Sequence, residues 1–327
     1  DQLGRVNLLT PEKTLEGIRE VVDGRSFCLS LPLDFPGGAV LNPRRLPPQL
    51  SPLMQEEGCP CFNYPLLRAD ARNTDVVNDD QVTLTLQYST QWDSLAHVGS
   101  LFDVNGDGTP EKVYYNGFRA NEHIVGPVDY GSGGDVAKEG PYGARVLDVA
   151  SLAVHGMQGR AVIIDLKRHF GLERRDVTYD DIRTVVDRDR IDIRPGDIVL
   201  LRTGFTEVLM AMNRNPDKAR LDATGCVLDG RDERLLQWIS DTQIAALCAD
   251  NYAVERVPAR EASGFRPALP LHEHCLFKLG VVLAELWWLK DLADWLAHRK
   301  RHALLLTAPP LRLPGAVGSP VTPIATV

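Results

Sequence analysis

Five short apolar runs, each about the length of one β-strand, constrain the fold of this 327-residue chain more than any other feature. They do not alternate apolar with polar residues, which is typical of strands that are covered on both faces. Loops separate the earlier strand patterns and helical patterns separate the later ones. We therefore predict an α/β layered domain with a mixed β-sheet core. The runs lie at residues 159–166, 194–204 (after an initial turn), 244–250, 281–285 and 302–308.

The amino-terminal part of the chain has a different character. Thr10, Pro11 and Glu12 predict the start of a helix that reaches about residue 22. Residues 34–80 are rich in Pro, Gly, Asn and Arg and show no sustained period, which predicts a loop-rich arm that serves as a lid or a subunit contact. No internal repeat or linker divides the remainder, so we predict a single domain over residues 1–327.

Residues 81–99 carry the first group of candidate catalytic side chains. Alternating apolar residues over 81–89 predict a strand, and Gln91, Asp93 and His97 follow it. A carboxylate and an imidazole four residues apart, just beyond a rigid strand, can form an acid/base pair or provide two metal ligands. A strand-end turn with a buried Trp and an incidental His explains the same pattern.

A second group of candidate residues lies near the carboxyl end of the chain. His272 and His274 flank an acidic residue, and Glu285 follows them. Imidazole and carboxylate groups are common ligands of divalent metals. On a helix, however, His272 and His274 point about 200° apart, so we expect only one of them to reach a given site. The alternative is a helix start with ordinary solvated side chains.

Composition argues against several classes of function. The 44 acidic residues outnumber the 36 basic ones, and the resulting charge of −8 disfavours a nucleic-acid partner. No apolar run approaches the roughly 20 residues of a membrane span, and no signal peptide is visible. The six cysteines are scattered, which predicts free thiols in a reducing compartment and a cytoplasmic location.

Familiar cofactor and nucleophile motifs do not occur in the sequence. There is no G-x-G-x-x-G, no Walker loop and no G-x-S-x-G, and the Gly/Ser run at 131–134 lacks the strand–helix context of a phosphate cradle. We therefore expect no nucleotide cofactor. Residues 103–109 resemble the start of an EF-hand loop, but Tyr114 stands where a bidentate Glu is required, so we predict a polar turn.

Several aromatic and amide side chains are candidates for a substrate pocket. Trp92, Tyr115, Asn116 and Phe118 would suit an aromatic or cyclic small molecule. Core packing explains Trp92 at least as well.

The order of segments along the chain resembles the putative cyclase family, the metal-dependent hydrolases that include kynurenine formamidase and isatin hydrolase. The match spans nearly the whole chain after the first arm, and the order of the motifs is more specific than any one of them. The segments that carry the resemblance are 90–97 (TQWDSLAH), 114–117 (YYNG), 159–165, 194–204, 249–251 (ADN), 271–272, 279–280 with Glu285, and 314–320.

This resemblance implies a swivelling α/β/β fold and a homo-oligomer, either a dimer or a tetramer, with active sites near subunit contacts. It also implies that metal-activated water attacks an amide, lactam, lactone or ester carbonyl while a His relays protons.

The family signature is only partly present. It reads His-x-x-x-His-x-Asp-x-Pro-x-His, and this chain has Gln87, Gln91, Asp93, Leu95 and His97 at the corresponding positions. A Gln carbonyl can bind a hard cation but is a poor substitute for imidazole with zinc. Either a reduced set holds a divalent ion, zinc or manganese, or the site has lost its metal. The reduced set is Asp93, His97, His272 or His274, and Glu285.

Three functional hypotheses follow. The first is a metal-dependent hydrolase of a small molecule. The second is a metal-independent cyclase, dehydratase or isomerase in which Asp93 and His97 act as acid and base, while Gln91 and Asn116 orient the substrate. The third is a non-catalytic binding protein on the same scaffold. Resemblance of fold does not choose among them.

Overall fold

A computed structural model describes residues 1–127 and 142–327 of the chain. The Gly/Ser run at 131–134 lies outside the described residues. In the part that is described, no helix is long and apolar enough to cross a membrane.

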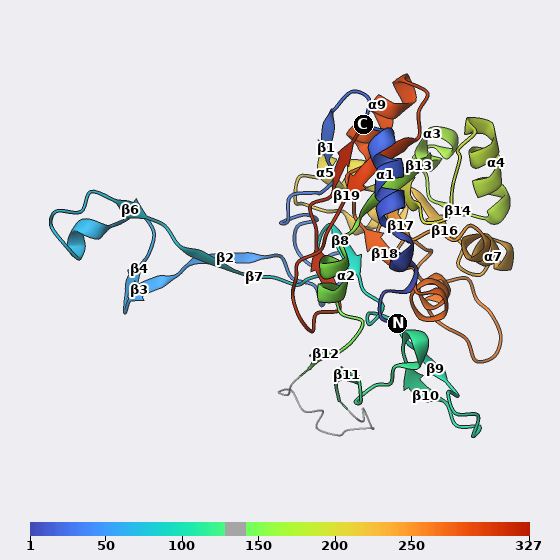
Figure 1. The fold of residues 1–327 in the computed structure, drawn as a ribbon, viewed down its shortest axis with the longest axis horizontal. Helices are drawn as coiled ribbons and strands as arrows, with labels where there is room; N and C mark the ends of the chain where they lie inside the picture. Colours follow the sequence, from blue (N-terminus) through green and yellow to red (C-terminus); the bar gives the residue numbers. More distant parts are fainter. Residues whose placement is uncertain (128–141) are drawn as a thin grey trace.

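A nine-stranded mixed sheet forms the centre of the molecule (Figure 1). Four neighbouring strands are parallel, and antiparallel strands flank them on both sides, which confirms the predicted mixed α/β sheet. In spatial order the strands are β1 (Ser26–Cys28), β21 (Ile324–Thr326), β19 (Ala303–Thr307), β13 (Gln158–Asp165), β15 (Ile198–Arg202), β17 (Ala246–Ala249), β18 (Val282–Glu285), β8 (Gln91–Asp93) and β20 (Gly318–Pro320).

The apolar runs of the sequence become the central strands. Every residue of β15, β17 and β18 is buried, and β13 is buried after its first residue. Strands covered on both faces lose no hydrogen bonds to solvent and bury apolar side chains on each side, so they need no polar alternation. These strands therefore hold the residues at their ends rigidly.

Helices cover the sheet and begin at recognisable caps. Thr10 accepts a hydrogen bond from the Lys13 amide at the start of α1 (Pro11–Arg19), which packs over β13 and β19. A capping box formed by Thr178 and Asp181 begins α4 (Tyr179–Asp189). The other α-helices are α2 (Val149–His155), α3 (Leu166–Phe170), α5 (Phe205–Ala211), α6 (Lys218–Asp222), α7 (Glu233–Asp241), α8 (Pro270–His272) and α9 (Lys290–His298).

Shorter helical segments and two-stranded ladders lie around this body. The 3-10 segments are η1 (Gly4–Leu8), η2 (Leu66–Arg68) and η3 (Tyr115–Gly117), and the π-helix η4 (Glu273–Leu279) continues α8. The paired strands are β9 (Ser100–Phe102) with β10 (Glu111–Val113), β11 (Ile124–Val125) with β12 (Gly143–Ala144), and β14 (Arg175–Val177) with β16 (Cys226–Leu228).

The predicted loop-rich arm contains short strands and projects far from the body (Figure 1). It exposes apolar side chains along its length, including Leu50, Met54 and Phe62. An isolated two-stranded ribbon is marginally stable in water. The role of this arm in a subunit contact stays a prediction, and so does the assignment of the whole chain to one domain. Its pairs are β2 (Gln49–Pro52) with β7 (Asp80–Thr83), β3 (Met54–Glu56) with β4 (Cys59–Pro60), and β5 (Tyr64–Pro65) with β6 (Val76–Val77).

The strand predicted over 81–89 is wrong in its position. β7 ends at Thr83, the chain turns near Tyr88, and the next strand is β8, which contains the candidate residues Gln91 and Asp93 themselves. The alternation was misleading because β7 belongs to the exposed arm, whereas β8 is buried on both faces between β18 and β20. The candidate residues are thus fixed by a strand.

Candidate metal centre

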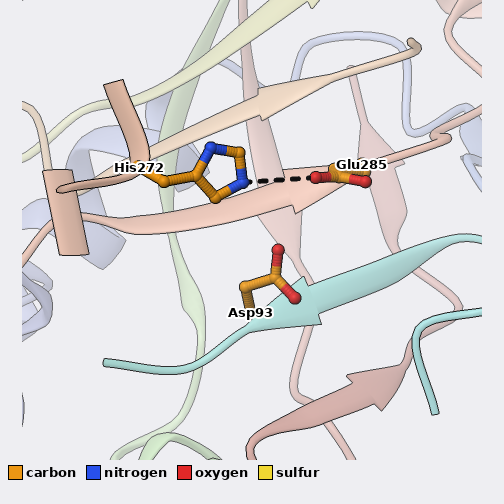
Figure 2. A group of neighbouring side chains, drawn as sticks. All are labelled: Asp93, His272 and Glu285. Carbon is orange, nitrogen blue, oxygen red and sulfur yellow. Dashed lines mark ion pairs between the residues drawn. The ribbon is translucent and has the colours of Figure 1, made fainter. Parts of the chain in front are cut away.

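Three buried side chains from distant parts of the chain meet at one place (Figure 2). Asp93 comes from β8, Glu285 from the last residue of β18, and His272 from the end of α8. Antiparallel pairing aligns Gln91 with Glu285 and Asp93 with Leu283, so the two acidic residues lie on neighbouring strands. One donor atom from each of Asp93, His272 and Glu285 lies within 4.8 Å of the others.

The centre is closed off from solvent. Asp93 is fully buried, and His272 and Glu285 are each 3% exposed. The His272 Nε2 atom lies 3.5 Å from Glu285 Oε1, and the Asp93 carboxylate points toward both (Figure 2). Electrostatic interactions among these groups are therefore strong, because little water is present to screen them.

His272 is held in place by Glu255, a residue that the sequence analysis did not identify. Glu255 Oε1 accepts a hydrogen bond of 2.7 Å from His272 Nδ1. Its carboxylate also accepts hydrogen bonds from the backbone N–H groups of Leu271 and His272, at 3.0 and 2.9 Å, in the first turn of α8, which begins at Pro270. These N–H groups would otherwise lack partners at a helix start. Donation from Nδ1 directs Nε2 toward Asp93 and Glu285.

The charges of the centre shift one another's ionisation. Burial alone would lower the pKa of His272, but its hydrogen bonds to Glu255 and Glu285, and the charges of both, raise it to about 10. Burial would raise the pKa of Glu285, but His272 outweighs this effect and lowers it. Burial raises the pKa of Asp93, although His97 and His272 act in the opposite direction.

His97 borders the centre and is partly exposed. Its Nε2 atom lies 3.8 Å from Asp93 Oδ1, and its Nδ1 atom lies 3.5 Å from the amide nitrogen of Gln87. The Gln87 side chain fits against Gly318, where any side chain would collide with it. Gln87, noted in the sequence only as a departure from the family signature, thus contacts the His97 ring.

The other predicted site residues lie elsewhere. His274 faces away, and its Nε2 atom contacts Ser240 Oγ and the carbonyl of Leu236. This agrees with the divergence expected of His272 and His274 on a helix. Trp92 packs edge-on against Trp287 in the core, and its indole N–H donates to the carbonyl of Ala308.

The residues expected to line an aromatic pocket also do not gather at this centre. Tyr115 and Asn116 contact Asp1 at the amino-terminal segment, and Phe118 stacks edge-on against His123. The chain leaves the centre after His97 to form β9 and β10, and the role of these residues in binding substrate stays a prediction.

Comparison with known proteins identifies the family. The family model described as "Putative cyclase" matches residues 29–256, which is more than half of the chain. The chain belongs to the putative cyclase family. No curated protein matches it.

Solved structures agree with this cyclase-family assignment. A structure described as a novel cyclase is 29% identical, with a TM-score of 0.74, and the match covers 100% of this chain and 94% of that one. Isatin hydrolase A from Labrenzia aggregata is 14% identical, with a TM-score of 0.57 and coverage of 93% of each chain. An isatin hydrolase bound to thioisatinate is also 14% identical, with a TM-score of 0.57 and coverage of 97% and 99%. The two hydrolases show the shared fold.

The residues of this cyclase-family centre fit a divalent cation. Asp93 Oδ2 is buried and lacks a hydrogen-bond partner among the described residues. Three carboxylates, from Asp93, Glu255 and Glu285, surround His272, and in the described parts of the chain no Lys or Arg forms an ion pair with them. His272 and, from farther away, the charge of Arg45 offset part of this negative charge. The buried negative charge that is left is costly unless a further cation compensates it.

A cavity borders the back of the centre. It has a volume of about 430 Å³, and Glu255 and Asn251 line it together with Tyr252 and Phe205. Tyr252 and Leu41 also line a smaller cavity next to Arg45 and Gln87. The larger cavity is partly apolar in its lining and has the size of a small-molecule site.

Proposed function

We propose that this protein is a hydrolase of a small-molecule amide, lactam, lactone or ester, and that Asp93, His272 and Glu285 hold a divalent ion, zinc or manganese. The observation that carries the proposal is the convergence of these three buried donor groups around an oxygen without a partner. Membership in the cyclase family supports an enzyme of this kind. The substrate would be a small aromatic or cyclic molecule, and a dimer or tetramer in the cytoplasm stays our expectation.

The protein's own groups have distinct tasks in this proposal. A bound divalent ion would lower the pKa of a coordinated water and polarise a carbonyl. Glu255 fixes the His272 ring through Nδ1, which keeps Nε2 directed at the centre. His97, whose Nε2 faces Asp93, is placed to accept and return a proton at that atom. Burial of Asp93 and Glu285 strengthens their electrostatic attraction for a cation.

The decisive experiment measures metal content and activity together. Protein purified without a histidine tag would be analysed by mass spectrometry for bound metal before and after chelator dialysis. The same samples would be assayed on aryl-amide, lactam and lactone panels. We expect near-stoichiometric metal, loss of turnover on chelation and recovery on re-addition. A folded, metal-free protein that cannot be loaded, or whose activity is indifferent to chelator, would falsify the proposal.

A second candidate function uses the same residues without metal. The contact between His97 and Asp93, at 3.8 Å, together with the raised pKa of Asp93, favours acid/base chemistry such as cyclisation, dehydration or isomerisation. Activity that survives complete chelation would select this candidate. In either case we expect His97→Ala to abolish turnover while ligand binding persists, and full activity of this variant would remove His97 from the mechanism.

A further inference from the structure

The buried amide of Gln91 lies between two pairs of oxygen atoms. On one side are the backbone carbonyls of Gln87 and Ser89, at 2.6 and 3.2 Å from one end of the amide. On the other side are the carboxylate atoms Asp93 Oδ1 and Glu285 Oε2, at 3.5 and 3.4 Å from the other end. Gln91 is fully buried, so its amide group does not contact bulk solvent.

The distances decide which end of the amide faces which pair. An amide has a nitrogen that donates and an oxygen that accepts. A separation of 2.6 Å from the Gln87 carbonyl is a hydrogen-bond distance only if the nitrogen is there, because two carbonyl oxygens without a proton between them repel. With the nitrogen donating to Gln87 and Ser89, the amide oxygen faces Asp93 and Glu285.

This orientation gathers three side-chain oxygens from three residues. The Gln91 amide oxygen joins Asp93 Oδ1 and Glu285 Oε2, and Asp93 Oδ2 beside them has no partner in the described chain. An amide oxygen and ionised carboxylates cannot donate hydrogen bonds to one another. The group is therefore stabilised either by a positive charge among its members or by a proton on Asp93, whose pKa burial raises.

We propose that the Gln91 amide oxygen is a ligand to the ion of the centre and that it biases the centre toward hard cations such as Mn²⁺. The inference rests on the proposed function, because it assumes that Asp93, His272 and Glu285 bind a divalent ion. The donor set then contains three oxygens and one imidazole nitrogen. Oxygen donors suit manganese and magnesium, whereas additional imidazole suits zinc.

The measurable quantity is the ratio of zinc to manganese affinity. Zinc binds more tightly than manganese at most sites of mixed donors, so the absolute preference is a poor test. Replacing the amide oxygen of Gln91 by an imidazole should increase the difference between the zinc and the manganese affinities. We expect Gln91→His to raise the ratio of zinc to manganese affinity by about tenfold or more, mainly through tighter zinc binding.

The test uses metal-stripped full-length protein and equilibrium dialysis against Mn²⁺ and Zn²⁺, with bound metal quantified by mass spectrometry. Gln158→His is the matched control, because Gln158 lies in the same sheet and its amide donates to Thr307 Oγ1 outside the centre. Its affinity ratio should equal that of the wild type. An unchanged ratio in a folded Gln91→His protein would overturn the role of the amide oxygen.

A second measurement does not depend on any variant. Wild-type crystals soaked in Mn²⁺ would be examined at the manganese absorption edge. A peak about 2.2 Å from the Gln91 amide oxygen supports the inference, and a peak beside Asp93 and Glu285 but out of reach of that oxygen overturns it. Binding of neither metal to the wild type would instead refute the proposed function, so the two failures are distinct.

Discussion

Acidic side chains lie at both halves of the carboxyl edge of the four parallel strands. The two halves differ in how many cationic side chains pair with these acids. At one half, Arg202 at the end of β15 pairs with Asp165 at the end of β13, at 2.9 Å. Arg202 also pairs with Glu207 and Asp294, each at 2.8 Å, and these neighbours raise its pKa although burial opposes them. Lysines 167 and 290 add further cations to the same carboxylates. The Arg and Lys side chains of the protein thus neutralise these acids, and we call this part of the edge the balanced half.

At the other half, the acidic residues outnumber their cationic partners. His272 is the ion-pair partner of both Glu255 and Glu285, and His97 is the ion-pair partner of Asp93. Between the two halves, Asp250 follows β17 and accepts three hydrogen bonds, from the Thr203 amide and hydroxyl and the Gly204 amide. The comparison teaches that buried acids alone do not mark a site. This group of acids, the unbalanced half, differs in that no Lys or Arg of the described residues forms an ion pair with it, although the charge of Arg45 acts on Asp93 and Glu285 from farther away.

The largest effect should come from removing an acid of the unbalanced half. We expect Asp93→Asn to reduce turnover by about 10³-fold, because the carboxylate is both a proposed ligand and the partner of His97. Metal content by mass spectrometry should fall with it, while the circular dichroism spectrum stays native. Retention of both metal and activity would show that the unbalanced half is not a metal centre.

Removing the cation of the balanced half should instead cost stability. We expect Arg202→Met to lower the free energy of unfolding by roughly 3–5 kcal/mol, since the buried carboxylate of Asp165 would lose its ion-pair partner. Urea denaturation measures this, and the exposed Arg194→Met serves as a control with a change below about 1 kcal/mol. Metal stoichiometry of the folded Arg202 variant should be normal. A loss of metal there would mean that the two halves are not independent.

A smaller effect is expected from the residue that orients His272. Glu255→Gln should weaken metal binding by about 10- to 100-fold, because a neutral amide holds the imidazole less firmly and with less charge. Isothermal titration with Mn²⁺ gives the affinity. The matched variant Glu207→Gln, in the balanced half, should leave it unchanged. Equal losses in both variants would indicate a general structural effect.

The smallest effect should follow from Gln87. We expect Gln87→Leu to lower kcat about tenfold with metal affinity unchanged, because the His97 ring loses its contact at Nδ1 while the three proposed ligands keep theirs. Steady-state kinetics combined with the titration separate the two quantities. A change in affinity without a change in kcat would place Gln87 at the ion and away from proton transfer.

Local sequence patterns predicted much of the fold because its central strands are covered on both faces. The apolar runs at 159–166, 244–250 and 281–285 became β13, β17 and β18 almost as expected. The arm was recognisable by composition, but its strand pairs were not, since they join residues with little apolar periodicity. The apolar alternation near residue 82 misled because β7 belongs to the exposed arm, whereas the buried strand β8 begins only at Gln91.

Prediction of the centre was limited by contacts between distant residues. Asp93, His272 and Glu285 were among the candidates because their chemical types and the family resemblance pointed to them. Glu255 carried no such signal, because its role arises only when α8 begins beside it. The orientation of the Gln91 amide likewise depends on carbonyl groups whose positions are set by the turn before β8.

The position of β8 in the sheet determines when the centre can form during synthesis of the chain. Both of its partners, β18 and β20, come from the last third of the sequence, whereas β8 itself comes from the first third. While the ribosome is still producing the middle of the chain, β8 has no neighbour in the main sheet, and His272 and Glu285 do not yet exist. The proposed ion can therefore bind only after synthesis is nearly complete, from the pool of metals that surrounds the finished protein.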